Sequence, residues 1–170
     1  GKLDNVEKAI SSEWKNIDDQ IWLIGSYKSD TTIAASSYLE YFHGEITGRP
    51  PKIDLLDEKF CQSFLRKAIS NNLLVSAHDI SDGGLAIALA ESCILSRKGV
   101  TIELKNDSNR DDNLLFGEGG SRIIFSISKM KQNEWLDHLK QNQINWPSSV
   151  YVKKIAVSYT HLTLPTIYSV

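Results

Sequence analysis

Cysteine, long apolar runs and an excess of charge of one sign are all scarce in this sequence. Its two cysteines, Cys61 and Cys93, lack metal-ligand spacing, so we expect buried, reduced thiols rather than a disulfide. Nineteen basic and twenty-one acidic side chains give a formal net charge of −2, which predicts neither a nucleic-acid partner nor a membrane surface. No apolar run reaches the ~20 residues that span a bilayer, and no signal peptide is visible. We therefore expect a cytoplasmic protein.

One stretch organises the rest of the chain. Residues 73–77 are mostly apolar and follow two asparagines, which predicts a short buried strand. Residues 85–95 have almost no polar face, which predicts a largely buried helix. Between them lies a turn in which Asp82 or Ser81 can cap the helix. Gly83 and Gly84 follow and should leave the first-turn amides of the helix uncovered for an anion.

This turn has two interpretations. Asp-Gly-Gly is also typical of a tight strand-to-helix connection that binds nothing. Two carboxylates, those of Asp79 and Asp82, would repel a bare phosphate, so an anion site here predicts Mg²⁺ as a bridge. Spacing alone does not choose between the two.

Four ordered blocks resemble a known family. Residues 76–91 read SAHDISDGGLAIALAE and are similar to the signature of the C-terminal domain of the aminoimidazole ribonucleotide synthetase superfamily. Within it, the resemblance is greatest to the phosphoribosylformylglycinamidine synthases, near the end of the second half of their chain. The other blocks are ASSYL with His43-Gly44, PPKIDL, and LFGEGGSR at residues 35–44, 50–55 and 115–122.

The resemblance implies a fold, a reaction and partners. The fold would be α/β, in layers, with one mixed sheet of about four strands and helices packed on it. The family's enzymes use ATP to phosphorylate the amide oxygen of formylglycinamide ribonucleotide, and ammonia from a glutaminase then displaces the phosphate. The implied cofactors are ATP or ADP and Mg²⁺, and the implied partners are an N-terminal ATP-binding domain and a glutaminase. Residues 1–18 would be a linker from that domain, and residues 19–155 the synthetase C-terminal-like domain.

The resemblance also implies site residues, without a catalytic one. The positions that match the family's metal ligand and its neighbouring hydroxyl are Asp79 and Ser81, with Gly83 and Gly84 in the same nucleotide-binding turn. In the second half of the family's chain, the corresponding site is a structural nucleotide site or is empty.

A second loop matches the family's sugar-phosphate loop. Here Glu118, Gly119, Gly120 and Arg122 are the candidates, although the family usually carries other residues where the two glycines stand. The alternative is an internal ion pair of Arg122, with Glu118 or with Asp82, that holds the loop.

Two further polar residues flank the turn. A histidine at a strand end, such as His78, is a possible base, but a hydrogen-bonded support is the commoner role. Glu91 lies alone on the apolar helix and should have a hydrogen-bond partner or a raised pKa.

The periodicity of the remaining chain predicts alternating strands and helices. Residues 105–113 are polar and should form a surface loop, and a helix over 34–42 should turn Leu39 and Phe42 inward. Other strands are expected over 21–25, 100–104, 123–127 and 150–155, and other helices from Asp57 and over 131–143.

The tail and two rival functions complete the expectations. Residues 156–170 depart from the family and resemble translated adapter sequence, so we expect a poorly packed read-through artefact. One rival is another ATP-dependent enzyme of the superfamily, such as thiamine-monophosphate kinase or the hydrogenase-maturation or selenophosphate enzymes. The other is a non-catalytic scaffolding domain that holds the ATP-binding domain and a glutaminase.

Overall fold

A four-stranded sheet forms the centre of the computed structural model, which describes residues 5–102, 104 and 110–161, with backbone alone for 156–161. The strand order is β2-β4-β1-β5, and every pairing in it is antiparallel. The α/β layered fold with a sheet of four strands is therefore as expected, although the sheet is antiparallel rather than mixed. The strands are β1 (Gln20–Ser26), β2 (Leu74–Asp79), β4 (Ile123–Ile127) and β5 (Val150–Lys154).

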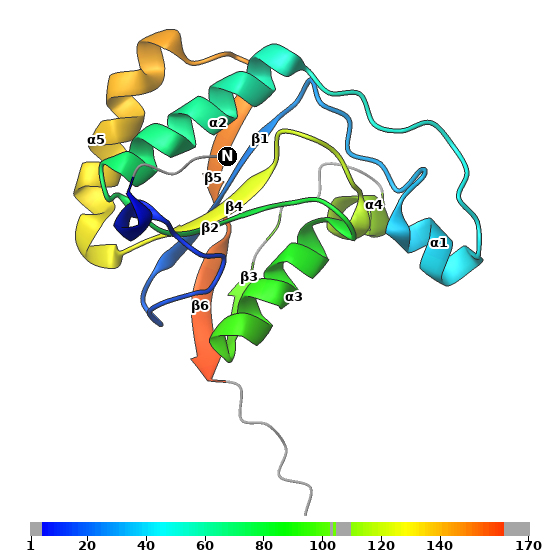
Figure 1. Ribbon diagram of the computed structural model, residues 1–170, viewed down its shortest axis with the longest axis horizontal. Coiled ribbons are helices and arrows are strands. Elements are labelled where there is room, and N and C mark those ends of the chain that lie inside the picture. The colour runs from blue at the N-terminus through cyan, green and yellow to red at the C-terminus, as the bar shows by residue number, and fades with distance from the viewer. Residues whose placement is uncertain (1–4, 103, 105–109, 162–170) are drawn as a thin grey trace, which may run out of the picture.

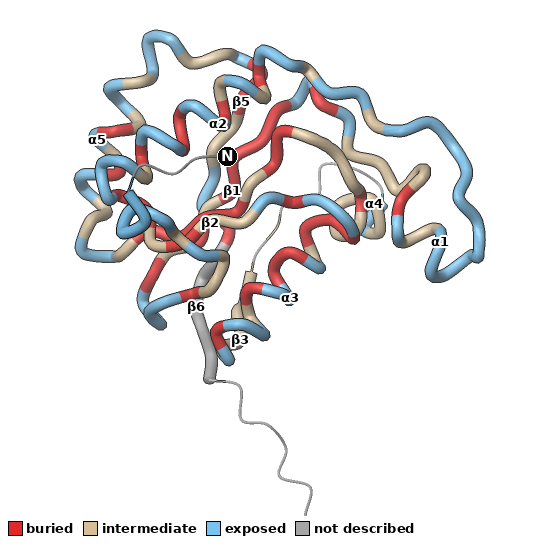
Figure 2. The backbone as a smooth tube through the Cα atoms, in the orientation of Figure 1, coloured by how far each residue is buried: buried red, intermediate tan, exposed pale blue. Residues whose placement is uncertain are grey.

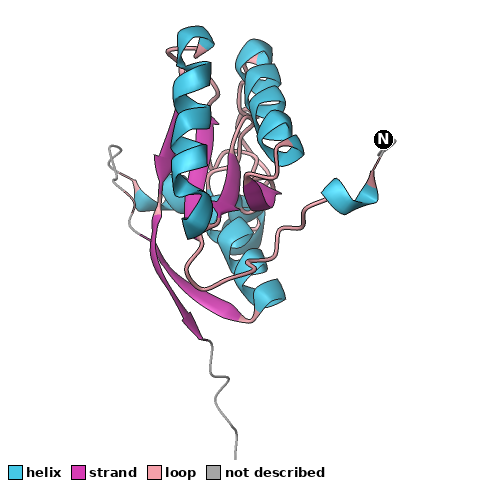
Figure 3. Cartoon of the chain, turned by 90° about the vertical axis from the view of Figure 1, so that its left-hand side faces the viewer, coloured by secondary structure: helices cyan, strands magenta, loops and turns pink. Residues whose placement is uncertain are grey.

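Helices cover both faces of this sheet (Figures 1 and 3). On one face lie α2 (Leu55–Ser70) and α5 (Gln132–Asn142), and on the other lies α3 (Gly84–Ser96). Short helices α1 (Ser37–His43) and α4 (Asp111–Phe116) lie at one end of α3, and single 3-10 turns η1 (Val6–Lys8), η2 (Lys129–Lys131) and η3 (Gln143–Asn145) complete the described helices.

Alternation along β1 divides the core into two clusters. Ile21 and Leu23 are buried on the α3 side, whereas Ile24 is buried against α2 and α5. Successive side chains of a strand point to opposite faces, so a sheet covered on both sides favours apolar residues on both faces of its strands. This explains why most positions of β1 and β4 are apolar and buried (Figure 2), with Ser126 as a buried polar exception in β4.

A two-stranded ribbon extends beyond the sheet. Strand β3 (Lys98–Ile102) pairs antiparallel with β6 (Ala156–His161), with Val100 opposite Tyr159. The tail that we expected to be poorly packed therefore begins as a paired strand, and residues 162–170 lie outside the described part. Within that part, no helix combines the length and apolar character needed to cross a membrane.

The structure corrects two predictions about local elements. Helix α4 occupies residues 111–116, where we expected a surface loop; positions 105–109 of that loop are outside the described residues. Phe42 is 64% exposed rather than turned inward, because α1 contacts the rest of the protein through Tyr38, which stacks on Phe116 at 5.0 Å. Trp14, in the predicted linker, is fully buried in the core.

Both cysteines are free thiols. Cys61 is fully buried in α2, and burial raises its pKa to about 12. Cys93 is half-buried, and burial raises its pKa as well. A thiol with a raised pKa holds its proton at neutral pH and is a poor nucleophile.

Candidate functional site

The turn between β2 and α3 presents its polar side chains to solvent. Strand β2 ends at Asp79, whose side chain is 76% exposed, and Ser81 and Asp82 are exposed beside it. Ile80 between them is buried, and its amide donates to the Arg122 carbonyl at 3.0 Å. Ile80 thus anchors the turn through its side chain and its amide, while the side chains of Asp79, Ser81 and Asp82 remain exposed.

The two glycines of the turn have conformations that other residues rarely adopt. Gly83 and Gly84 have φ angles of +76° and +71°, in the left-handed region. A Cβ added to Gly84 would lie 2.7 Å from the carbonyl carbon of Phe116 and 2.8 Å from the Gly117 oxygen. Gly84 therefore lets the start of α3 approach the end of α4 to main-chain contact.

The expectation that the first-turn amides are uncovered fails for the amides of the two glycines themselves. The Gly84 amide donates to the Ser81 carbonyl at 3.1 Å, and the Gly83 amide donates to Glu118 Oε1 at 2.8 Å. The prediction that Asp82 or Ser81 caps α3 is also wrong. The N-cap residue of α3 is Gly83, which has no side chain to accept a hydrogen bond from the first turn. A carboxylate of the protein itself already occupies the electropositive start of the helix.

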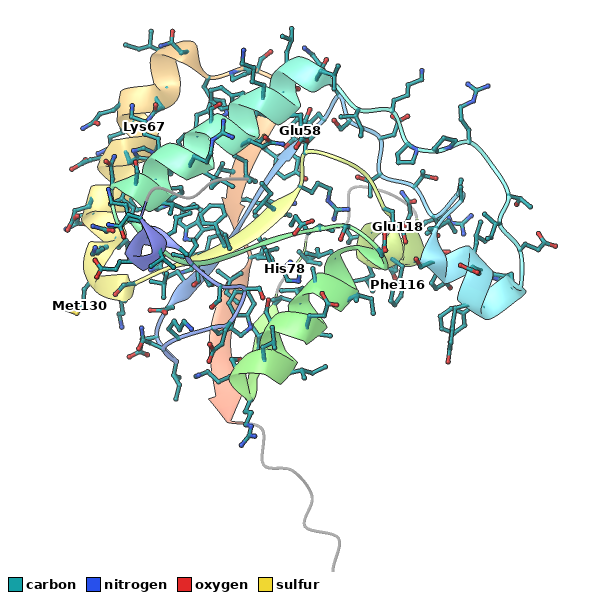
Figure 4. All side chains as sticks on the ribbon, viewed as in Figure 1. Glu58, Lys67, His78, Phe116, Glu118 and Met130 are labelled. Carbon is teal, nitrogen blue, oxygen red and sulfur yellow. The ribbon has the colours of Figure 1, made fainter. Side chains whose placement is uncertain are left out.

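Glu118 joins two helix starts and a loop. Its Oε1 also accepts from the Ser37 amide at the start of α1, at 2.9 Å, and its backbone exchanges hydrogen bonds of 2.8 and 3.0 Å with Thr32. Figure 4 shows Glu118 between α1 and the start of α3, next to Phe116. We call this set of bonds the Glu118 clasp. The glycines of the loop indicated its position in the sequence. Nothing in the sequence indicated the partners of the Glu118 carboxylate, because they are backbone amides 35 and 81 positions away.

Arg122 does not pair with Glu118 or with Asp82, so both internal ion pairs that we considered are wrong for these described residues. Arg122 is 6% exposed, and its guanidinium donates to the Gly117 carbonyl at 3.1 Å. Burial lowers the pKa of Arg122, and the Tyr151 hydroxyl opposes that shift.

Gly119 and Gly120 lie where the loop between α4 and β4 packs closely against other segments. A Cβ on Gly119 would lie 2.2 Å from the Asp30 carbonyl oxygen, and one on Gly120 would lie 2.9 Å from the Ile53 side chain. The two glycines thus allow the loop to pack against residues 30 and 53.

His78 supports the turn through hydrogen bonds. Its Nε2 lies 2.8 Å from Glu91 Oε2, and its Nδ1 lies 3.5 Å from Asp79 Oδ1. The histidine therefore links β2 to α3, and Glu91 has the partner that we expected for it (Figure 4 labels His78). Both ring nitrogens face carboxylates.

The turn offers a metal ion exposed carboxylates but no complete set of protein ligands. Within the described residues no group of three or more His, Cys, Asp and Glu side chains lies close enough to hold a metal ion. Mg²⁺ commonly binds through one or two carboxylates together with substrate phosphates and water. Asp79 fits the role of a single ligand of that kind, with the remaining ligands from elsewhere.

Comparisons with known proteins agree on one family. Phosphoribosylformylglycinamidine synthase subunit PurL from Prochlorococcus marinus strain MIT 9301 is 88% identical over 155 residues, which cover 91% of this chain and 20% of the relative. The same subunit from strain MIT 9515 is 62% identical over 165 residues, covering 96% of this chain and 21% of the relative. The chain thus spans about a fifth of the length of these curated relatives.

Solved structures share the fold at low identity. Thermotoga maritima PurL complexed with FGAR superposes with a TM-score of 0.64 at 16% identity, covering 90% of this chain and 26% of that one. Escherichia coli HypE, a hydrogenase maturation protein, superposes at 0.55 and 11% identity, covering 90% and 47%. The profile of the AIR synthase related protein C-terminal domain matches residues 16–147. The chain belongs to this family of AIR synthase related C-terminal domains.

Proposed function

We propose that this chain is part of a phosphoribosylformylglycinamidine synthase, an ATP-dependent ligase that converts formylglycinamide ribonucleotide and glutamine-derived ammonia to the amidine. The observation that carries the proposal is 88% identity to a PurL subunit over 155 residues. The chain covers a fifth of that relative, so we expect the 170-residue chain alone to be inactive. Residues 19–155 would be the synthetase C-terminal-like domain, 1–18 its linker and 156–170 a non-family tail; the family match ends at residue 147.

In this proposal the β2–α3 turn contacts a nucleotide bound mainly by another domain. Asp79 would be a Mg²⁺ ligand, because its carboxylate is exposed at the end of β2 and oxygen ligands suit that ion. When bound, Mg²⁺ offsets the negative charge of the nucleotide phosphates. Ser81 would donate a hydrogen bond from its exposed hydroxyl to the nucleotide. Gly83 and Gly84 would contribute the shape of the turn, since their amides are already hydrogen-bonded.

The loop of Glu118, Gly119, Gly120 and Arg122 would face the ribonucleotide substrate through its backbone. The Glu118 clasp supports a positioning role, because the carboxylate holds the loop against α1 and α3. The partners would be the N-terminal ATP-binding domain and a glutaminase. T. maritima PurL has been solved in complex with ATP, at 14% identity to this chain, and as an assembly named PurLQS.

A chimera tests the proposed ligase. Residues 1–155 of this chain replace the matching fifth of the MIT 9301 subunit, and amidine formation from ATP, glutamine and the ribonucleotide is measured with its glutaminase. We expect activity close to that of the unaltered subunit. A folded chimera without activity would refute the proposal, and a chimera carrying a HypE segment is the control for fold alone.

A scaffolding role is the second candidate. The internally bonded amides of Gly83 and Gly84 favour it, since they leave fewer donors for a phosphate. On this alternative, Asp79→Asn in the chimera would leave both turnover and nucleotide content unchanged. The ligase proposal predicts that at least one of them falls.

A further inference from the structure

A cavity lies on the α3 side of the sheet, behind the loop that carries Arg122. Its volume is about 180 Å³, and its polar lining comes from Arg122, Lys153, Tyr151, Asn113 and Thr31. The described lining residues include two cations and no carboxylate. Such a lining attracts anions, because the charged side chains among its described residues are both positive.

One tyrosine lines the cavity together with both cations. The Lys153 ammonium lies 5.3 Å from the centre of the Tyr151 ring, and Arg122 lines the same cavity. Burial raises the pKa of Tyr151, so its hydroxyl stays protonated at neutral pH. Gly25 on the neighbouring strand makes room for this ring, because a Cβ there would lie 2.3 Å from the Tyr151 hydroxyl oxygen.

The buried guanidinium is the strongest donor in the cavity. The Arg122 residue is 6% exposed, and the described hydrogen bond of its guanidinium goes to the Gly117 carbonyl. A guanidinium has five N–H donors in a planar fork, so it has capacity for an oxyanion beside this carbonyl. Asn113, held by bonds to Thr31 and Ile33, fixes the opposite wall.

We propose that this cavity binds the phosphate group of a small phosphate ester, through Arg122, Lys153 and Tyr151. Cavities for drug-sized ligands hold about 300–1,000 Å³, so a volume of about 180 Å³ suits a phosphate with a few further atoms rather than a whole nucleotide. The ribonucleotide of the proposed ligase carries such a group, and only the identity of the ester rests on that proposed function. The site is separate from Asp79 and from the β2–α3 turn.

Titration of the 170-residue chain with inorganic phosphate tests the cavity. Backbone amide resonances of residues 122 and 151 are followed by NMR at constant ionic strength set with chloride. We expect saturable shifts, weakened about 5–10-fold by Lys153→Gln, since one charge next to an anion contributes on that scale near a protein surface. Ribose 5-phosphate in place of phosphate tells whether an ester binds more tightly than the free ion.

Lys154→Gln is the matched control. It removes the same charge from the next residue of β5, whose side chain points to the other face beside Trp22. We expect its phosphate affinity to stay within twofold of the unaltered chain. Absence of saturable shifts, or equal weakening by the two lysine variants, would overturn the cavity proposal. Tyr151→Phe, which keeps the ring, should weaken binding less than Lys153→Gln; an unchanged affinity in both would also overturn it. An inactive chimera with an intact phosphate site would count against the ligase alone.

Discussion

Gly84→Ala and Gly44→Ala compare a glycine in close main-chain contact at the start of α3 with a glycine that faces open space. Gly84 and Gly44 have nearly equal φ angles, +71° and +68°. A Cβ at Gly84 would meet main-chain atoms of Phe116 and Gly117 within 3 Å, whereas a Cβ at Gly44 would have nothing within 4 Å. The conformational cost is thus shared, about 1–2 kcal/mol for a residue other than glycine in the left-handed region. Only Gly84→Ala adds a steric cost.

The steric cost should be about 1–3 kcal/mol, the usual range for forcing extra volume into packed structure. We therefore expect Gly84→Ala to lower the free energy of unfolding by about 2–5 kcal/mol and Gly44→Ala by about 1–2 kcal/mol. Urea unfolding followed by tryptophan fluorescence measures both, with unchanged m-values as the sign of two-state unfolding. Equal losses for the two variants would refute the claim that α3 begins in main-chain contact with α4.

Three further predictions concern buried polar groups. Burial lowers the pKa of His138, so the imidazole binds a proton more readily in the unfolded chain than in the folded one. The free energy of unfolding should therefore fall as the pH drops below about 6.5. His138→Phe should reduce this pH dependence, as measured by thermal unfolding between pH 7.5 and 5.5. Asp57→Ala should lower the free energy of unfolding by about 1–3 kcal/mol, because it leaves the buried Ser26 hydroxyl, which donates to Asp57 at 2.5 Å, without its acceptor. In a double-mutant cycle of unfolding free energies, its effect should not add to that of Ser26→Ala; full additivity would contradict the contact. Cys61, with a pKa of about 12, should resist a thiol reagent at pH 8 until urea unfolds the chain; rapid labelling of the native chain would contradict its burial.

The central strands could be predicted from the sequence because both faces of the sheet are covered. Mostly apolar residues along β1 and β4 are a local signal, and the structure places both strands within one residue of the predicted bounds. Helix α4 carried no such signal. It has six residues in a charged stretch, and Asn113 ties it to residues 31 and 33, some 80 positions earlier.

The candidate site was predictable in composition but not in its bonding. Sequence reasoning found the β2–α3 turn and the loop of Glu118 because their glycines and acids are close in the chain. It missed that the two segments bond to each other through Glu118 and Gly83, a contact across 35 positions. It also missed that Arg122 faces Tyr151, because only the pairing of β5 with β1 brings that ring over Gly25.

The central claim is that the β2–α3 turn offers Asp79 to a metal-bound nucleotide. The direct measurement is the nucleotide retained by the purified chimera after gel filtration in Mg²⁺, compared between Asp79→Asn and Asp82→Asn, which neutralise two exposed carboxylates of one turn. We predict that Asp79→Asn loses the bound nucleotide and that Asp82→Asn keeps it. Full retention in Asp79→Asn would contradict the claim.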